Sequence, residues 1–246
     1  MTEVIYYILS AFAVLLTLTV HEYCHGYAAY KLGDNTAKNL GRLTLNPIKH
    51  IDPIGAICML FFHVGWAKPV PINARNFKDP KKGFAITAIA GPAINLVLAF
   101  ISALVYKIMI VSLRDVMFTP DSFGLRFWEN MLLFVFLFHS INLGLGMFNL
   151  LPFPPFDGSR ILHVILPAKV YFGIMKYERK IYFGVLAWLL LGDYIANFFR
   201  MIPFIGNTPF LYSLVGIFSL SDMLGTAITA VSGFMFSFWE LFPILR

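Results

Sequence analysis

The chain has 246 residues, of which 59% are hydrophobic and only 13% are charged, with a mean hydropathy of +0.74. A soluble globular domain carries about 25% charged residues, so this composition excludes a soluble protein and indicates a polytopic membrane protein with the lipid bilayer as a partner. The net charge of +6 does not indicate a nucleic-acid partner, because lysine and arginine in a membrane protein mark the loops that stay in the cytoplasm.

Long apolar stretches predict the membrane-spanning helices, because about 20 apolar residues are needed to cross a bilayer as a helix. In chain order, the predicted spans cover about residues 4–30, 83–110, 127–151 and 181–199. A last apolar stretch, residues 210–242, is too long for one untilted crossing and short for two. The predicted fold class is therefore an all-α polytopic membrane protein with about five to six transmembrane helices. We expect a single membrane-embedded domain, with a catalytic core in residues 1–166 and accessory helices in residues 180–246.

A polar and basic stretch, residues 31–82, separates the first two predicted spans. Within it, the apolar residues 54–66 are too few to cross a bilayer and favour a re-entrant or interfacial segment. Pro69 and Pro71 follow and favour extended backbone over helix. We therefore expect a small re-entrant β or extended element after the first helix.

The distribution of lysine and arginine predicts the orientation in the membrane. With five spans and the amino terminus outside, nine of these residues in the loop 31–82 and five in the loop 158–180 lie on the cytoplasmic side. Only three, Arg114, Arg126 and Arg200, lie on the opposite side. This bias predicts an integral multi-pass protein of the cell membrane, with its active site toward the cytoplasm and its amino terminus outside.

The first predicted span contains the pattern H-E-x-x-H in His21, Glu22 and His25. Residues i and i+4 share one face of a helix, so both imidazoles can reach one Zn²⁺, with Glu22 beside the metal to take a proton from its bound water. Each ionisable group at bilayer depth costs roughly 2.5–3.5 kcal/mol, so three of them within five residues indicate a function. At 1.5 Å per residue they lie roughly 8–14 Å below the cytoplasmic edge. No basic n-region precedes this stretch, so we expect it to be retained.

A catalytic zinc usually has three protein ligands, and the best candidate for the third is Asp157. It follows a proline-rich segment at the cytoplasmic end of the third predicted span, on the same side as His25. The alternative is that Asp157 caps a short amphipathic helix in residues 158–166. His139, deeper in the third span, is a second candidate ligand, although structural hydrogen bonding is favoured for it.

Three sets of residues match a known family in order and spacing. They are His21-Glu22-x-x-His25, Gly91-Pro92-x-x-Asn95 and Asn149-x-x-Pro152-x-Pro154-x-x-Asp157-Gly158, supported by residues 41–47 and the segment that ends at Asn73. Over residues 20–165 the chain resembles the site-2 protease family of intramembrane zinc metalloproteases, in its short form without PDZ or CBS domains. The resemblance implies one Zn²⁺ per chain with Asp157 as its third ligand, Glu22 as general base, and a partly unfolded helical substrate.

Three asparagines are candidate substrate-binding residues, each with a structural alternative. The family pattern favours Asn149 as a group that binds the substrate backbone, whereas polar residues in membrane helices also bond between helices. For Asn95 we expect one of two roles, contact with the substrate or support of close helix packing. Asn73 is expected to fix the substrate backbone at the end of the extended edge. We assign no role to His50, His63, Asp193 or Asp222.

The sequence therefore predicts an intramembrane zinc metalloprotease that hydrolyses peptide bonds within or near transmembrane segments of membrane proteins, in regulated intramembrane proteolysis or membrane-protein turnover. A transporter would need ionisable residues along a path and two structural repeats, whereas here they cluster at one depth. A catalytically silent relative is disfavoured by the intact Glu22. The sequence does not specify the substrate, the trigger of cleavage or the oligomeric state.

Overall fold

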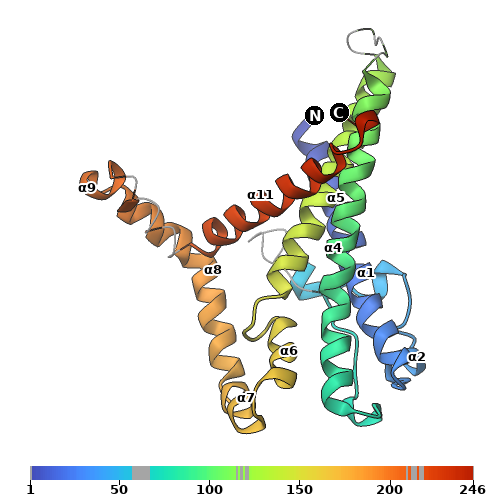
Figure 1. Ribbon diagram of the computed structural model, residues 1–246, viewed down its shortest axis with the longest axis vertical. Coiled ribbons are helices and arrows are strands. Elements are labelled where there is room, and N and C mark those ends of the chain that lie inside the picture. Colours follow the sequence, from blue (N-terminus) through green and yellow to red (C-terminus); the bar gives the residue numbers. More distant parts are fainter. Residues whose placement is uncertain are drawn as a thin grey trace.

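The structure is a computed structural model, and it describes residues 2–56, 67–114, 116, 119, 122–208, 210, 211, 215 and 219–245. These residues are mainly helical. In Figure 1 the long helices run side by side, and a second group of helices lies to one side of them. Most of the predicted re-entrant apolar segment, including His63, lies outside the described residues.

The three long helices are α1 (Thr2–Lys31), α4 (Pro80–Leu113) and α5 (Phe123–Asn149). All three are long and apolar enough to cross a membrane. Their outward side chains include exposed residues such as Val97, Ile101 and Phe127, which is the pattern expected where lipid replaces water. These helices match the first three predicted spans, and they indicate an integral membrane protein.

The fourth predicted span corresponds to α8 (Glu178–Arg200), which bends by 44° between its two halves. The described residues contain three candidate spans, or four if the bent helix α8 is counted as one crossing, compared with the five to six predicted. The difference lies in the last apolar stretch. Its helix α11 (Leu220–Trp239) begins only at residue 220, where the Ser219 hydroxyl accepts a hydrogen bond from the Asp222 amide at 2.9 Å.

Polar contacts attach α11 to the long helices. The buried His139 ring contacts the Ala99 carbonyl at 2.8 Å through Nδ1 and the Ser232 hydroxyl at 2.9 Å through Nε2. Because a carbonyl only accepts, Nδ1 carries the proton and Nε2 accepts from the hydroxyl. His139 thus joins three helices, which is the structural role favoured from the sequence. At the other end of α11, Arg200 pairs with Asp222 at 2.5 Å and joins α11 to α8.

The loop after α1 is built from short pieces: α2 (Thr36–Asn39), η1 (Pro47–Lys49) and η2 (Ala74–Asn76). The predicted β or extended element appears as one isolated antiparallel bridge between Ile51 and Ala67, with no strand in the part of the chain that the structure describes. The Lys68 amide donates to the His50 carbonyl at 2.8 Å beside this bridge. Residues 68–73 follow without helix, as the prolines predict.

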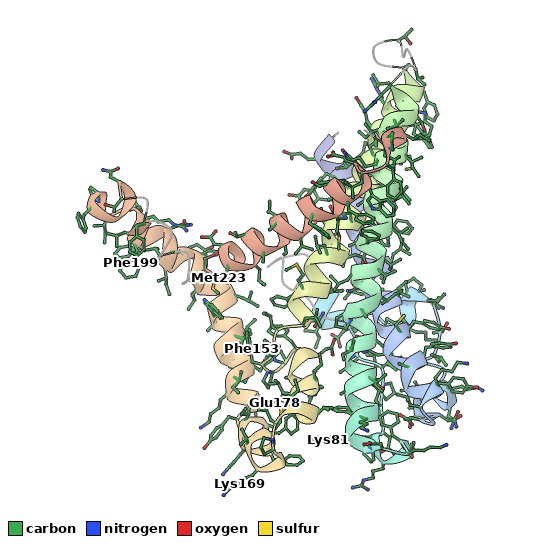
Figure 2. All side chains as sticks on the ribbon, in the orientation of Figure 1. Lys81, Phe153, Lys169, Glu178, Phe199 and Met223 are labelled. Atoms are coloured by element: carbon green, nitrogen blue, oxygen red, sulfur yellow. The ribbon has the colours of Figure 1, made fainter. Side chains whose placement is uncertain are left out.

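Short helices complete the chain: α6 (Gly158–Ile165), α7 (Ala168–Met175), α9 (Pro203–Gly206) and η4 (Pro243–Leu245). The helix α6 confirms the short amphipathic helix predicted for residues 158–166. Lys81 at the start of α4 and Lys169 in α7 lie at the same end of the molecule (Figure 2), whereas the amino terminus lies toward the opposite end (Figure 1).

Candidate metal centre

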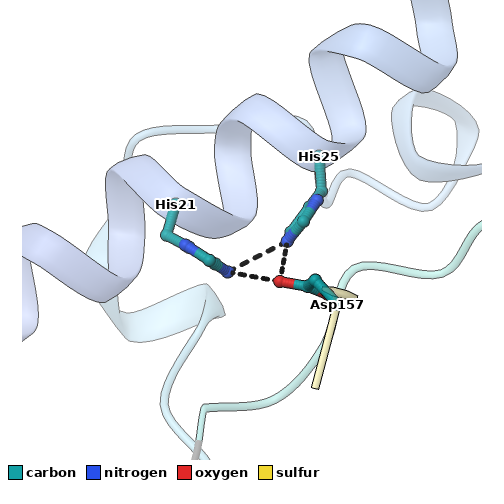
Figure 3. A group of neighbouring side chains, drawn as sticks. All are labelled: His21, His25 and Asp157. Carbon is teal, nitrogen blue, oxygen red and sulfur yellow. Dashed lines mark hydrogen bonds and ion pairs between the residues drawn. The ribbon is translucent and has the colours of Figure 1, made fainter. Parts of the chain in front are cut away.

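The side chains of His21, His25 and Asp157 meet at one point (Figure 3). The two histidines lie one turn apart on α1 and are only 4% and 6% exposed. Their Nε2 atoms are 2.9 Å apart, and each lies 3.2 Å from Asp157 Oδ2. Asp157 stands at the first position before α6, but its side chain makes no capping hydrogen bond. The structure thus brings the three predicted ligands together and does not show the capping alternative.

The geometry of these three atoms fits a tetrahedral metal ion. Metal–ligand bonds of about 2.0–2.1 Å separate tetrahedral ligand atoms by roughly 3.3–3.4 Å, close to the observed 2.9 and 3.2 Å. Two neutral imidazoles and a carboxylate all present lone pairs, so their convergence in a buried site favours a bound cation. Two histidines and one carboxylate are also a known catalytic zinc ligand set, which leaves the fourth position open.

The far side of each imidazole ring is held by α4. The Nδ1 atom of His25 lies 2.7 Å from the Thr87 carbonyl, which only accepts, so the proton is on Nδ1 and the Nε2 lone pair is free for a metal. The Nδ1 atom of His21 lies 3.1 Å from the Nδ2 atom of the fully buried Asn95, whose Oδ1 atom has no hydrogen-bond partner among the described residues. The amide oxygen and nitrogen are interchangeable in shape. If Nε2 of His21 binds a metal, the ring proton is on Nδ1 and needs an acceptor. The amide oxygen of Asn95 can accept this proton, whereas the amide nitrogen cannot, so the oxygen faces His21 in the metal-binding state.

A glycine allows α4 to approach the ligands closely. A Cβ atom built on Gly91 would lie 2.4 Å from Nε2 of His25 and 2.7 Å from Cε1 of His21. Any side chain at this position would therefore occupy the space of the two rings. This close approach gives a physical reason for glycine in the Gly91-Pro92 pair of the sequence pattern.

The carboxylate of Glu22 lies next to the ligands and is itself held in place. Its Oε2 atom accepts a hydrogen bond from the backbone amide of Val70 at 2.8 Å. Val70 belongs to the non-helical residues 68–73, so this segment lies against α1 beside the metal centre. This contact could not be predicted from the sequence, because the two residues are 48 positions apart and a backbone amide donor is present in almost every residue type.

Burial and the two histidines have opposite effects on Asp157. Burial alone raises the pKa of its carboxyl group, but the hydrogen bonds from His21 and His25, together with the positive charge that these rings carry when they are protonated and no metal is bound, outweigh burial and hold this pKa well below its usual range. Asp157 is therefore an ionised carboxylate at neutral pH, the form that binds a metal.

A cavity of about 700 Å³ opens beside the metal centre. Its lining includes the three candidate ligands, Glu22, and Asn149 at the end of α5. Side chains of α8 also line it: Tyr182, Val185, Leu186 and Leu189. An apolar wall opposite a polar centre suits a chain that carries apolar side chains and exposes one peptide bond.

The three predicted substrate-binding asparagines have different positions. Asn149 lines the cavity, and its Nδ2 atom donates to the Leu145 carbonyl at 3.1 Å. Asn95 contacts His21, as described above. The Asn73 side chain accepts from the Arg75 amide at 3.1 Å, so it caps the short helix η2. For all three residues, contact with substrate stays a prediction.

Comparisons with known proteins agree with this geometry. A model of peptidase family M50 matches residues 110–191. YwhC of Bacillus subtilis, provisionally named a zinc metalloprotease, is 41% identical over 202 residues, which cover 79% of this chain and 89% of YwhC. Rip2 of Mycolicibacterium smegmatis, also provisionally named a zinc metalloprotease, is 27% identical over 149 residues, which cover 58% of this chain and 52% of Rip2.

The zinc metalloprotease MJ0392 of Methanocaldococcus jannaschii is 26% identical over 163 residues, which cover 66% of this chain and 35% of that protein. No solved structure matches the chain at comparable significance. The similarity to YwhC extends over most of both chains, and the family model covers the third span, the Asp157 region and the start of α8. The chain therefore belongs to peptidase family M50 and is a peptide-bond hydrolase.

Proposed function

We propose that this chain is an intramembrane zinc metalloprotease that hydrolyses peptide bonds within or near the transmembrane segments of membrane-protein substrates, in regulated intramembrane proteolysis or membrane-protein turnover. The observation that carries the proposal is that Asp157 lies within hydrogen-bonding distance of His21 and His25, and that the two histidines belong to a helix long enough to cross a membrane. The zinc metalloprotease names of the relatives support zinc as the metal.

The chemistry divides between the metal and Glu22. The two histidines and Asp157 would hold the zinc, which when bound would supply Lewis-acid polarisation of the scissile carbonyl and a water whose pKa is lowered to about 7. Glu22 accepts a proton from the attacking water and passes it to the leaving amine. Glu22 is suited to this role because it lies between His21 and His25 in the sequence and lines the same cavity as the three ligands, and its Oε2 atom already has a donor in Val70.

The substrate enters as a locally unwound segment. A peptide carbonyl inside a helix is already hydrogen-bonded and is shielded by side chains, so it does not reach the centre until the helix opens. The apolar side chains of α8 supply contacts for the substrate's apolar residues. Asn149, which lines the cavity, would bind a backbone group of the unwound segment, with Asn95 and Asn73 as further candidates.

The orientation follows from the charged loops. The loop 31–82 and the loop 158–180 contain most of the lysine and arginine, and Lys81 and Lys169 lie at one end of the molecule (Figure 2). We place this end in the cytoplasm, with five to six crossings in all and one domain whose core is residues 1–166.

Asp79→Cys, in a background without Cys24 and Cys58, should be labelled only after a membrane-impermeant reagent gains access to the cytoplasm. Labelling from outside would reverse the orientation.

The decisive experiment compares the wild-type chain with Glu22→Gln. A panel of tagged single-pass proteins is co-expressed with each, and the fragments are identified by mass spectrometry. We expect cleavage only with the wild type, while Glu22→Gln keeps one zinc per chain because Glu22 is not a ligand. Substantial turnover by zinc-loaded Glu22→Gln would rule out Glu22 as the general base. Absence of zinc from the purified wild type would rule out zinc as the bound metal.

A further inference from the structure

The segment of residues 67–73 lies directly against the helix that carries Glu22. Val70 is 6% exposed, and its Cγ1 atom lies 3.1 Å from the position that a Cβ atom would take on Gly26. Side-chain packing against α1 therefore fixes the position of Val70. The same residue points its backbone amide at Glu22, at 2.8 Å.

One end of the segment is held by Arg42. Its guanidinium Nη2 atom donates to the Lys68 carbonyl at 2.8 Å and to the Pro69 carbonyl at 3.3 Å. These two carbonyls immediately precede Val70 in the chain. Arg42 thus fixes the backbone just before the donor that reaches Glu22.

The other end is held by Asp34, which is 0% exposed and lies three residues after the end of α1. Its Oδ2 atom accepts from the Asn73 amide at 2.7 Å, and its Oδ1 atom accepts from Asn76 Nδ2 at 2.7 Å and from the Thr36 amide at 3.0 Å. Burial alone raises the pKa of Asp34, but these donors outweigh it and lower the pKa. A buried ionised carboxylate with this many donors is a strong anchor.

We propose that Val70 and Asp34 are positioning residues for Glu22: the anchored segment presents the Val70 amide so that the Glu22 carboxylate is held in one orientation for proton transfer. This inference rests on the proposed function. A glutamate side chain loses rotamer freedom when it is ordered. A pre-placed donor supplies that ordering before the substrate arrives, and a misplacement of about 1 Å costs on the order of 100-fold in rate.

The main alternative is that the segment pairs with the substrate backbone as an added strand. The Val70 amide is the donor such pairing would use at this position, but it is already bonded to Glu22. The two roles affect different kinetic constants. Loss of a positioning contact lowers kcat and leaves KM unchanged, whereas loss of a substrate contact that is equal in the ground and transition states raises KM.

The experiment measures kcat, KM and zinc content for Val70→Pro and Val70→Ala in the full-length chain, with a cleavable substrate found in the panel above. Proline removes the amide hydrogen, whereas alanine keeps it and removes only side-chain packing. We expect kcat of Val70→Pro to fall at least 10-fold below that of Val70→Ala, toward about 100-fold, with KM unchanged and one zinc per chain. Equal kcat for the two variants, or a rise in KM alone, would overturn the proposal.

A second variant acts at a distance from the cavity and covers the case in which Val70→Pro does not fold. Asp34→Ala releases the far anchor, and we expect it to lower kcat with unchanged KM and zinc. In the double variant Asp34→Ala/Val70→Pro, kcat should be little lower than in Val70→Pro alone, because both changes act through the orientation of Glu22. Fully additive effects on kcat would contradict this common mechanism. Wild type and Glu22→Gln run in parallel. If these two do not differ, the proposed function fails, whereas a failure of the Val70 comparison alone removes only this inference.

Discussion

Replacing Gly91 by alanine should destroy the metal centre while leaving the helix that carries it intact. The added methyl carbon would lie 2.4 Å from Nε2 and 2.6 Å from Cε1 of His25, and 2.7 Å from Cε1 of His21. Carbon atoms normally approach to about 3.5 Å, so the rings must move by roughly 1 Å, whereas metal sites tolerate ligand displacements of about 0.2 Å. We therefore expect zinc affinity to fall at least as far as for loss of a supporting hydrogen bond, about 10–100-fold, which is about 1.4–2.7 kcal/mol.

The assay is zinc content after dialysis against chelators of graded affinity, together with thermal unfolding of the zinc-free chain. Gly233→Ala is the matched control, because it also adds a methyl group to a helix but meets no atom within 4 Å. Alanine favours a helix over glycine by about 1 kcal/mol, so a folding defect is not the expected cause of zinc loss. Wild-type zinc affinity in Gly91→Ala would refute the assignment of His21 and His25 as ligands that meet against α4.

Three further predictions test the centre and its supports. Asp157→Ala should lose most of its zinc, whereas His139→Ala should keep zinc but lose about 1–3 kcal/mol of stability, seen as a lower Tm; the opposite pattern in metal analysis would move the third ligand to α5. Asn95→Leu should weaken zinc binding by about 10–100-fold, whereas Asn95→Asp keeps an acceptor for His21 and should bind zinc more tightly than Asn95→Leu; equal affinities would exclude the orienting role. Because the pKa of Asp34 is lowered in the folded chain, its stabilisation is fully present above the ordinary aspartate pKa of about 3.9 and is lost as the pH falls through the lower, folded value. Tm measured against pH should therefore fall less steeply on acidification in Asp34→Asn, and an unchanged slope would contradict the anchor.

Local patterns in the sequence were sufficient for the arrangement of His21, Glu22 and His25, because helix geometry alone brings residues four apart to one face. The approach of Asp157 to these histidines was predicted from its position at the cytoplasmic end of the third span, on the same side as His25, and the match to a family pattern supported this choice, since no local rule joins a loop after the third span to the first. The short helix α6 was predicted because its apolar residues recur with helical spacing over a short range.

Contacts between distant segments were beyond this kind of reasoning. Val70 donates through its backbone, which every residue except proline possesses, and Asn95 reaches His21 across 74 residues of sequence. Apolar content joined residues 210–242 into one predicted stretch, whereas the helix α11 begins inside this stretch, after its cap Ser219. Apolar content sets how much chain is buried in lipid, and capping residues decide where each helix starts.

The order in which the ligands appear along the chain has a consequence for biosynthesis. His21 and His25 are made with the first helix, but Asp157 follows only after the third long helix has been synthesised. A nascent chain that holds only the first two long helices thus has two of three ligands and lacks the carboxylate that completes the set. The proposed ligand set is therefore complete only after the third long helix and the loop that follows it have been synthesised.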